Sequence, residues 1–181
     1  VDNFTRLGDI NIKGGTPTPN NTAPSLVDGK EIFIRSGNLT VDNSLVMPGI
    51  FNEVSSQLSN QPANGGRVEV RVAGDVTITG NRLLFGLDSG IHARAGFNAP
   101  PLTTLRDVPD ISVEAGGTLK ISGLNATVRS ERFVQGTSSP VSFGNIAITA
   151  DRVEVLAGGQ ISANSSIGKG GDLTVNAREI V

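Results

Sequence analysis

The sequence predicts an all-β protein whose short strands stack as a parallel β-helix. Three observations support this fold class: the composition, a two-strand unit that recurs along the chain, and segments of unequal length between the units. Of 181 residues, 23 are glycine and 7 are phenylalanine, and there is no tyrosine or tryptophan. This composition suits narrow sheets better than a helical core. Disorder is disfavoured because 37% of the residues are hydrophobic and fall in short, regular runs.

The first strand of the unit recurs as an alternating triplet with an aliphatic residue at each end. The triplets occupy residues 32–34, 68–70, 111–113, 146–148 and 173–175. Because side chains alternate between the two faces of a strand, the outer residues of each triplet share one face. We therefore expect one buried column to contain Ile32, Val68, Ile111, Ile146 and Leu173.

The second strand follows the first at a nearly constant offset, at residues 39–41, 76–78, 119–121, 153–155 and 180–181. A third element is expected at 49–51, 90–92, 127–129 and 160–162. It predicts a further buried column of Ile50, Ile91, Val128 and Ile161. The turn between the first and second strands contains Gly37, Gly74, Gly116 and Gly117. We expect these turns to require positive φ angles, which glycine adopts readily.

Similar strands joined by segments of unequal length indicate a solenoid, because loop length in a sandwich is coupled to strand register. In a parallel β-helix, each strand hydrogen-bonds to its equivalent in the next coil, about 4.8 Å away. The repeat predicts about five coils, with the loops of variable length at one corner.

Outward-facing charges provide an independent check on this register. Arg71 is expected beside Glu114, and Lys120 beside Glu154. A further outward column alternates in sign: Glu53, Arg94 and Glu131. Opposite charges on adjacent strands stabilise the pairing by about 0.2–1 kcal/mol, so a wrong alignment would seldom produce this pattern.

The chain divides into a short N-terminal part and a repeat region. Residues 1–29 are expected to form a partial coil and a loop rich in proline and asparagine, since proline interrupts a β-ladder. Residues 30–181 form the β-helix repeats. The chain has no starting methionine and ends within a second strand, so we expect the native protein to continue beyond this fragment.

Composition also excludes several kinds of chemistry. Without cysteine there is no disulfide, thiolate zinc site or cysteine nucleophile. A single histidine excludes multi-histidine metal centres, and no segment has the spacing of a calcium-binding loop. We therefore expect no cofactor and no metal. Fifteen basic and 17 acidic residues nearly balance, which argues against a nucleic-acid partner.

Two groups of side chains are candidates for catalysis. His92 follows Ile91 and is expected to point outward into solvent, with no serine and carboxylate converging on it. Enzymes that cleave polysaccharides need two or three clustered carboxylates. Three acidic residues lie near the corner between the first and second strands: Asp75, Glu114 and Asp151. Because Arg71 and Arg152 can pair with them, we interpret them as solvated corner charges and predict that the chain is not an enzyme.

The best candidate for binding is the long segment from Phe97 to Asp107. It contains apolar side chains, Phe97, Leu102 and Leu105, together with Arg106. Solenoids usually bind through loops grouped on one side of the scaffold, so we expect a binding surface at Phe97, Leu102 and Arg106. The alternative is that this loop packs on the wall of its own coil.

Two stretches carry a family resemblance: VEVLAGGQISA at residues 153–163 and GGDLTVNA at residues 170–177. They resemble the repeats of filamentous-haemagglutinin-like exoproteins of the cyanobacterial type, most closely over residues 110–181. The resemblance implies a right-handed parallel β-helix, export by two-partner secretion through an outer-membrane transporter, and adhesion at the cell surface. The Asn-Pro-Asn motifs of the family's secretion domain are absent, so we expect the transporter to recognise a domain outside this chain.

Three hypotheses for function follow. The leading one is a non-enzymatic, secreted or cell-surface shaft or adhesin segment that contacts a receptor or glycan on a host or neighbouring cell. The second is a carbohydrate-active β-helix enzyme of the polysaccharide lyase or hydrolase type. The third is a structural surface or sheath protein that assembles end to end.

Overall fold

The computed structural model describes residues 7–14, 26–28, 31–47, 67–80, 89–95, 109–132, 144–165 and 170–181. All regular elements within these residues are β-strands, and all the strand pairings among them are parallel. The all-β class and the parallel pairing are therefore confirmed. None of the described residues belongs to a helix long and apolar enough to cross a membrane.

The strands are β1 (Ile10–Lys13), β2 (Leu26–Asp28), β3 (Glu31–Ser36), β4 (Leu39–Asp42), β5 (Leu45–Met47), β6 (Arg67–Val72), β7 (Val76–Thr79), β8 (Ser89–Ala95), β9 (Asp110–Ser122), β10 (Ala126–Arg132), β11 (Ile146–Leu156), β12 (Gln160–Ser165) and β13 (Leu173–Ile180). They form two sheets. The eight-stranded sheet has the order β1-β4-β7-β9-β11-β13, with β3 and β6 joined to it through β9. The five-stranded sheet has the order β12-β10-β8-β5-β2.

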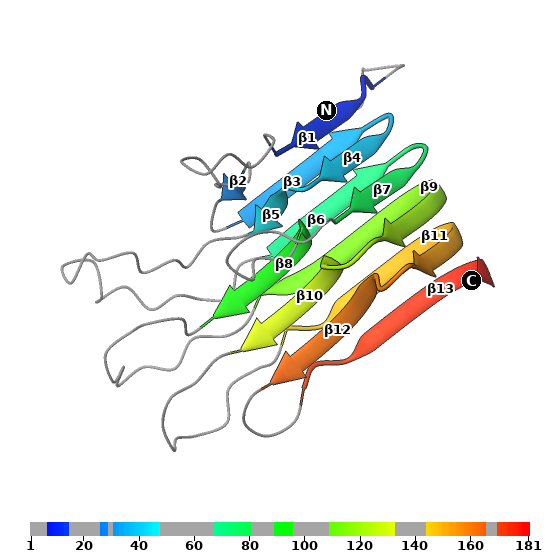
Figure 1. The fold of residues 1–181 in the computed structure, drawn as a ribbon. Coiled ribbons are helices and arrows are strands. Elements are labelled where there is room, and N and C mark those ends of the chain that lie inside the picture. The colour runs from blue at the N-terminus through cyan, green and yellow to red at the C-terminus, as the bar shows by residue number, and fades with distance from the viewer. Residues whose placement is uncertain are drawn as a thin grey trace.

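Figure 1 shows the strands stacked in successive levels from β1 to β13. We call the strands of one level a tier: the four central tiers are β3–β5, β6–β8, β9–β10 and β11–β12, and they lie between a tier of β1–β2 and a last tier that contains β13. The long strands β9 and β11 each span two positions of the tier, since β9 pairs with both β6 and β7. The segments that lead from one tier to the next, 48–66, 96–109, 133–145 and 166–172, are unequal in length, and most of their residues lie outside the described part of the chain.

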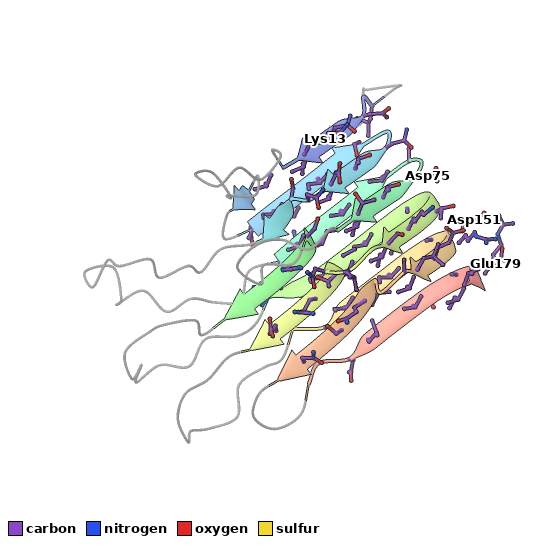
Figure 2. All side chains as sticks on the ribbon, viewed as in Figure 1. Lys13, Asp75, Asp151 and Glu179 are labelled. Atoms are coloured by element: carbon purple, nitrogen blue, oxygen red, sulfur yellow. The ribbon has the colours of Figure 1, made fainter. Side chains whose placement is uncertain are left out.

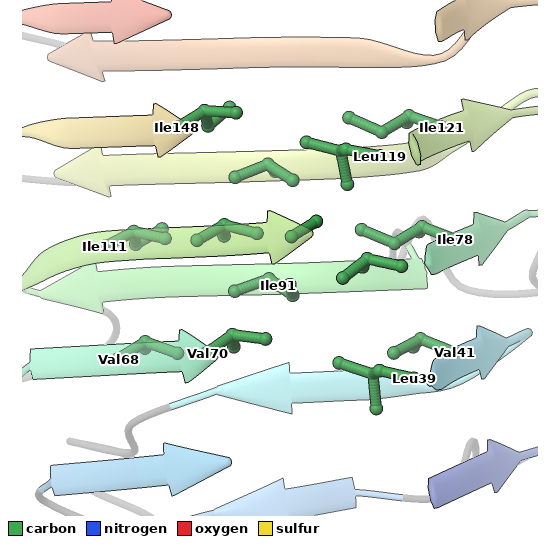
Figure 3. Close-up of a cluster of buried hydrophobic side chains, with 14 of the residues drawn as sticks. Leu39, Val41, Val68, Val70, Ile78, Ile91, Ile111, Leu119, Ile121 and Ile148 are labelled. Atoms are coloured by element: carbon green, nitrogen blue, oxygen red, sulfur yellow. The ribbon is translucent and has the colours of Figure 1, made fainter. Parts of the chain in front are cut away.

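The predicted register of the first and second strands is confirmed along the whole stack, but burial is not, because Leu173 in the last strand is 46% exposed. The first runs through Ile32, Val68, Ile111, Ile146 and Leu173. The second runs through Leu39, Val76, Leu119, Val153 and Ile180, and β1 extends it with Ile10. From β3 to β11 the aliphatic side chains of these columns are buried together, and Figure 3 shows members of the cluster repeating from tier to tier, whereas Leu173 and Ile180 of β13 are exposed.

The third predicted column is confirmed for β8, β10 and β12 and is wrong in the tier β3–β5. Ile91, Val128 and Ile161 are in register as expected. On its other side, however, Ile91 pairs with Val46 and not with Ile50. Ile50 itself lies outside the described residues.

The error at Ile50 comes from the length of the second turn. Asn43 has a φ of 48°, a left-handed conformation that asparagine tolerates, and β5 begins at Leu45, just two residues later. The sequence pattern aligns Gly49–Phe51 with Gly90–His92 only because an isoleucine follows a glycine in both segments. Because this turn is short, the third strand begins earlier in the sequence than the pattern predicts.

The glycines of the first turn serve a different purpose from the one predicted. Gly37, Gly74, Gly116 and Gly117 do not have positive φ angles. A Cβ atom at Gly74 would instead lie 2.3 Å from Asn38 Oδ1, and one at Gly117 would lie 2.2 Å from Asp75 Oδ1. Gly74 and Gly117 need to be glycine because a polar side chain from the preceding tier occupies the space of a Cβ atom, and Gly116 because the backbone carbonyl oxygen of Ala73 would lie 2.3 Å from it.

Gly90 combines both requirements and provides a test of the packing between tiers. Its φ is +149°, and a Cβ atom there would lie 1.8 Å from the carbonyl oxygen of Thr127 in the next tier. We predict that Gly90→Ala lowers the free energy of unfolding by about 1–3 kcal/mol, measured by urea denaturation. Gly8→Ala is the matched control, because no atom lies within 4 Å of its Cβ position. Equal stability of the two variants would contradict the close approach of β8 and β10.

Candidate functional site

The predicted binding loop lies outside the residues that the structure describes. Phe97, Leu102 and Arg106 all fall in the segment 96–108, so their role stays a prediction. A candidate site has to be sought among the described strands and the turns between them.

The expectation for His92 is wrong. Its side chain is fully buried, and Nε2 lies 2.5 Å from the hydroxyl oxygen of Thr127 in the next tier. Ile91, on the opposite face of the same strand, is also fully buried. The alternation of side chains along a strand predicts to which face of β8 His92 points. It does not predict whether other residues cover that face. His92 is therefore a buried structural residue and not a surface base.

Asp75, the first catalytic candidate, belongs to a ladder of side chains at the first turn. Asp9 Oδ1 accepts the backbone N–H of Asn38 at 2.9 Å, and Asn38 Oδ1 accepts that of Asp75 at 2.8 Å. Asp75 Oδ1 in turn accepts the backbone N–H of Thr118 at 2.7 Å. Each side chain thus connects its own tier to the next one, and we call this set the corner ladder.

Glu114 and Asp151 are also engaged with neighbours. Glu114 pairs with Arg71 at 3.3 Å, as predicted. Asp151 pairs with Arg178 of β13, whereas the sequence-based interpretation had offered Arg152 as its partner. Figure 2 shows Asp75, Asp151 and Glu179 along one edge of the stack. Among the described residues, no group of three acidic or histidine side chains is close enough to hold a metal ion.

Arg152 instead joins two other carboxylates. It donates from Nε to Glu154 at 2.7 Å and also bonds to Glu179 of the next tier. The hydrogen bond to Glu154, and then the negative charges of Glu179 and Glu154, raise the pKa of Arg152 above its ordinary value. The predicted pair Lys120–Glu154 is also present, at 4.0 Å. These contacts connect the last tiers to one another.

An open groove of about 490 Å³ lies beside the first turn. Its lining includes charged, polar and small side chains: Arg35, Arg71, Ala73, Glu114, Gly116 and Thr149. Arg35, Arg71, Glu114 and Thr149 occupy one outward column, because each is in register with the next. The groove therefore follows the stacking direction across four successive tiers.

An exposed aromatic ring lies beside this groove on the same face. Phe33 points outward from β3 between Glu31 and Arg35, and 51% of its surface is exposed. The guanidinium carbon of Arg67 lies 4.6 Å from the centre of the ring. Glu69, in register with Phe33, pairs with Arg71 at 3.0 Å and with Arg67 at 3.7 Å. We call Phe33, Arg35, Arg67, Glu69, Arg71 and Glu114 the outer charged face.

Sequence reasoning missed the outer charged face, although two signals for it were present. Phe33 is the middle residue of a first-strand triplet, so the predicted register already placed it outward. The same register placed Arg35 beside Arg71, two charges of the same sign.

Comparison of the chain with protein-family models, characterised proteins and solved structures finds no match.

The corner ladder makes a prediction about Asp75. We expect Asp75→Ala to lower the free energy of unfolding by about 0.5–1.5 kcal/mol, because the N–H of Thr118 loses its acceptor. Asp75→Asn keeps a side-chain oxygen in the same place, as Asn38 does one tier earlier, and is expected to stay within about 0.5 kcal/mol of the wild type. Urea denaturation at neutral pH measures both. An equal loss in the two variants would mean that the negative charge, and not the acceptor, holds the turn.

Proposed function

We propose that this chain is a segment of the shaft of a filamentous-haemagglutinin-like exoprotein, wound as a right-handed parallel β-helix of about five coils. The observation that carries this proposal is the register itself. Equivalent residues pair tier after tier in the eight-stranded sheet, from Ile10 at one end to Ile180 at the other. A chain that repeats one pairing rule in this way builds length without changing its cross-section, which suits a shaft.

The proposed mechanism is mechanical. Between the first and second strand positions, the amide of Gly37 bonds to the carbonyl oxygen of Gly8 at 2.9 Å, that of Gly74 to Gly37 at 2.7 Å, and that of Gly117 to Gly74 at 2.9 Å. The corner ladder runs beside these bonds. Extension of the stack would have to break several hydrogen bonds at once, each worth about 0.5–1.5 kcal/mol. Such a stack would hold loops or a distal tip away from the cell.

A non-enzymatic role is supported by the engagement of the candidate carboxylates. Asp75 accepts a hydrogen bond in the corner ladder, Glu114 pairs with Arg71, and Asp151 pairs with Arg178. Glycoside cleavage instead needs two carboxyl groups held about 5–10 Å apart around a substrate, one of them in its protonated form. The surroundings of these three residues favour structural over catalytic work.

The cell-surface location is proposed from the repeat sequences at residues 153–163 and 170–177 and from the absence of cysteine. A chain without disulfides can pass unfolded through an outer-membrane transporter. In this proposal the transporter recognises another part of the exoprotein, and the shaft contributes to adhesion or contact with a neighbouring cell.

Incubation with a panel of acidic and neutral polysaccharides tests the enzymatic alternative. We expect no new reducing ends and no unsaturated products. Turnover that is lost in Asp151→Ala, with Glu179→Ala as the control at the same edge, would overturn the non-enzymatic role.

Protease treatment of intact cells that produce the full protein tests the location, because a surface shaft is cleaved without cell lysis. Protection until lysis would contradict it.

A further inference from the structure

The buried columns fix the register between two paired strands, but they do not select which tiers become neighbours. Ile32, Val68 and Ile111 occupy one column, and all three are buried aliphatic side chains. If β3 paired directly with β9, Ile32 would meet Ile111, a contact of the same kind. Chains built from similar repeats misassemble in this way, because each strand accepts more than one partner. The core therefore does not favour β6 over β9 as the neighbour of β3.

The outward charges do distinguish a neighbouring tier from the one beyond it. In the described strands, side chains of opposite sign share a register position in these pairs: Lys13–Asp42, Glu31–Arg67, Arg67–Asp110, Arg71–Glu114, Lys120–Glu154 and Arg152–Glu179. Arg35 and Arg71 have the same sign, but Arg71 is also paired with Glu69 and Glu114. Opposite charges on adjacent strands stabilise their pairing, and like charges oppose it.

Carboxylates and amides alternate in the same sense along two ladders of side chains. The members are Asp9, Asn38 and Asp75 at the first turn, and Asp110, Asn145 and Asp172 at the start of the first strands. Asn38 donates from Nδ2 to Asp9 Oδ1 at 3.0 Å, while its own Oδ1 accepts the backbone N–H of Asp75. An asparagine thus separates two carboxylates that would repel each other on adjacent strands.

A stack that skipped the tier β6–β8 would lose most of this complementarity. It would break three opposite pairs: Glu31–Arg67, Arg67–Asp110 and Arg71–Glu114. With β3 on β9, Glu31 would face Asp110, a like charge, and Arg35 would face Glu114, an opposite one. One attraction and one repulsion would therefore replace three attractions and the like-charged pair Arg35–Arg71.

The other skipped arrangements are disfavoured in the same way. Without the tier β3–β5, Asp9 would lie beside Asp75, and without β11–β12, Asp110 would lie beside Asp172. Each of these contacts would bring two carboxylates together on adjacent strands. Without β9–β10, Asp75 would gain Arg152, but three opposite pairs would be lost: Arg67–Asp110, Arg71–Glu114 and Lys120–Glu154.

We propose that the outward charges and the two alternating ladders set the order of the tiers, by disfavouring the pairing of strands that are two tiers apart. The aliphatic columns set the register within each pair of strands, and the charges select the partner. This inference concerns how the stack assembles, and it goes beyond the proposed function as a shaft.

Oxidative refolding of the full chain from urea tests the proposal. Phe33 and Ser112 share an outward column with Glu69 between them, so their Cα atoms lie about 9.6 Å apart, too far for a disulfide. In the double variant Phe33→Cys with Ser112→Cys, the bond therefore reports β3 paired with β9. We expect Glu31→Arg to raise the fraction of this disulfide about fivefold or more, because it makes the native pair repulsive and the skipped pair attractive. Mass spectrometry without reduction measures that fraction.

Gly171→Ala in the same cysteine background is the matched control. A Cβ atom at Gly171 would lie 2.1 Å from the carbonyl oxygen of Gly144, so this change lowers stability in a distant tier without changing a charge. We expect the disulfide fraction to stay within about twofold of the parent, since the charges of the competing pairs are the same. At about 1 M salt the effect of Glu31→Arg is expected to disappear, because the charges are screened.

Three results would overturn the proposal: no increase in Glu31→Arg, an equal increase in Gly171→Ala, or an increase in Glu31→Arg that persists at high salt. Circular dichroism verifies that each variant is folded. None of these results bears on the proposed shaft, so failure of the two proposals is distinguishable.

Discussion

Every feature of this protein depends on the parallel, in-register pairing of equivalent residues in successive tiers. Side chains alternate between the faces of a strand, so a slip of one residue would move a whole buried column to the surface. Ile32, Val68 and Ile111 hold the register from inside, where all three are buried. The same constraint spaces the outward side chains at one interval, about 4.8 Å, along the stack. Buried and outward-facing residues therefore both occur in columns.

The turns show how polar residues enforce this register where no core is present. The Gly-Asx pairs at residues 37–38 and 74–75 place a bare backbone next to a hydrogen-bonding side chain. The glycine leaves room for the oxygen from the preceding tier, and the Asx residue extends the ladder to the following one. At the start of the first strands, Asp110 accepts the amide of Asn145, which accepts that of Asp172. Short polar side chains in register thus stabilise the stacking at the edges of the sheet, as aliphatic side chains stabilise it in the core.

Much of this arrangement could be predicted from the sequence because period-two alternation and a constant strand offset are local signals. They identified both columns of the eight-stranded sheet and the pair Arg71–Glu114. The position of β5 could not be found in the same way, since its start depends on a left-handed Asn43. Burial of His92 depends on what covers the outer side of β8, which strand alternation does not encode. The outward column of Arg35, Arg71 and Glu114 follows from the predicted register, whereas the groove beside it does not, because its depth depends on how the turn and the neighbouring side chains pack.

The central claim is tested most directly by placing pairs of cysteines in this cysteine-free chain. Thr40 and Thr77 are in register on β4 and β7, so their Cα atoms lie about 4.8 Å apart, within the range of a disulfide. Thr40→Cys with Thr77→Cys is expected to form the bond on mild oxidation. Thr40→Cys with Thr79→Cys, two residues out of register, is expected not to form it. Equal cross-linking of the two pairs, or a preference for the second, would contradict the stacking.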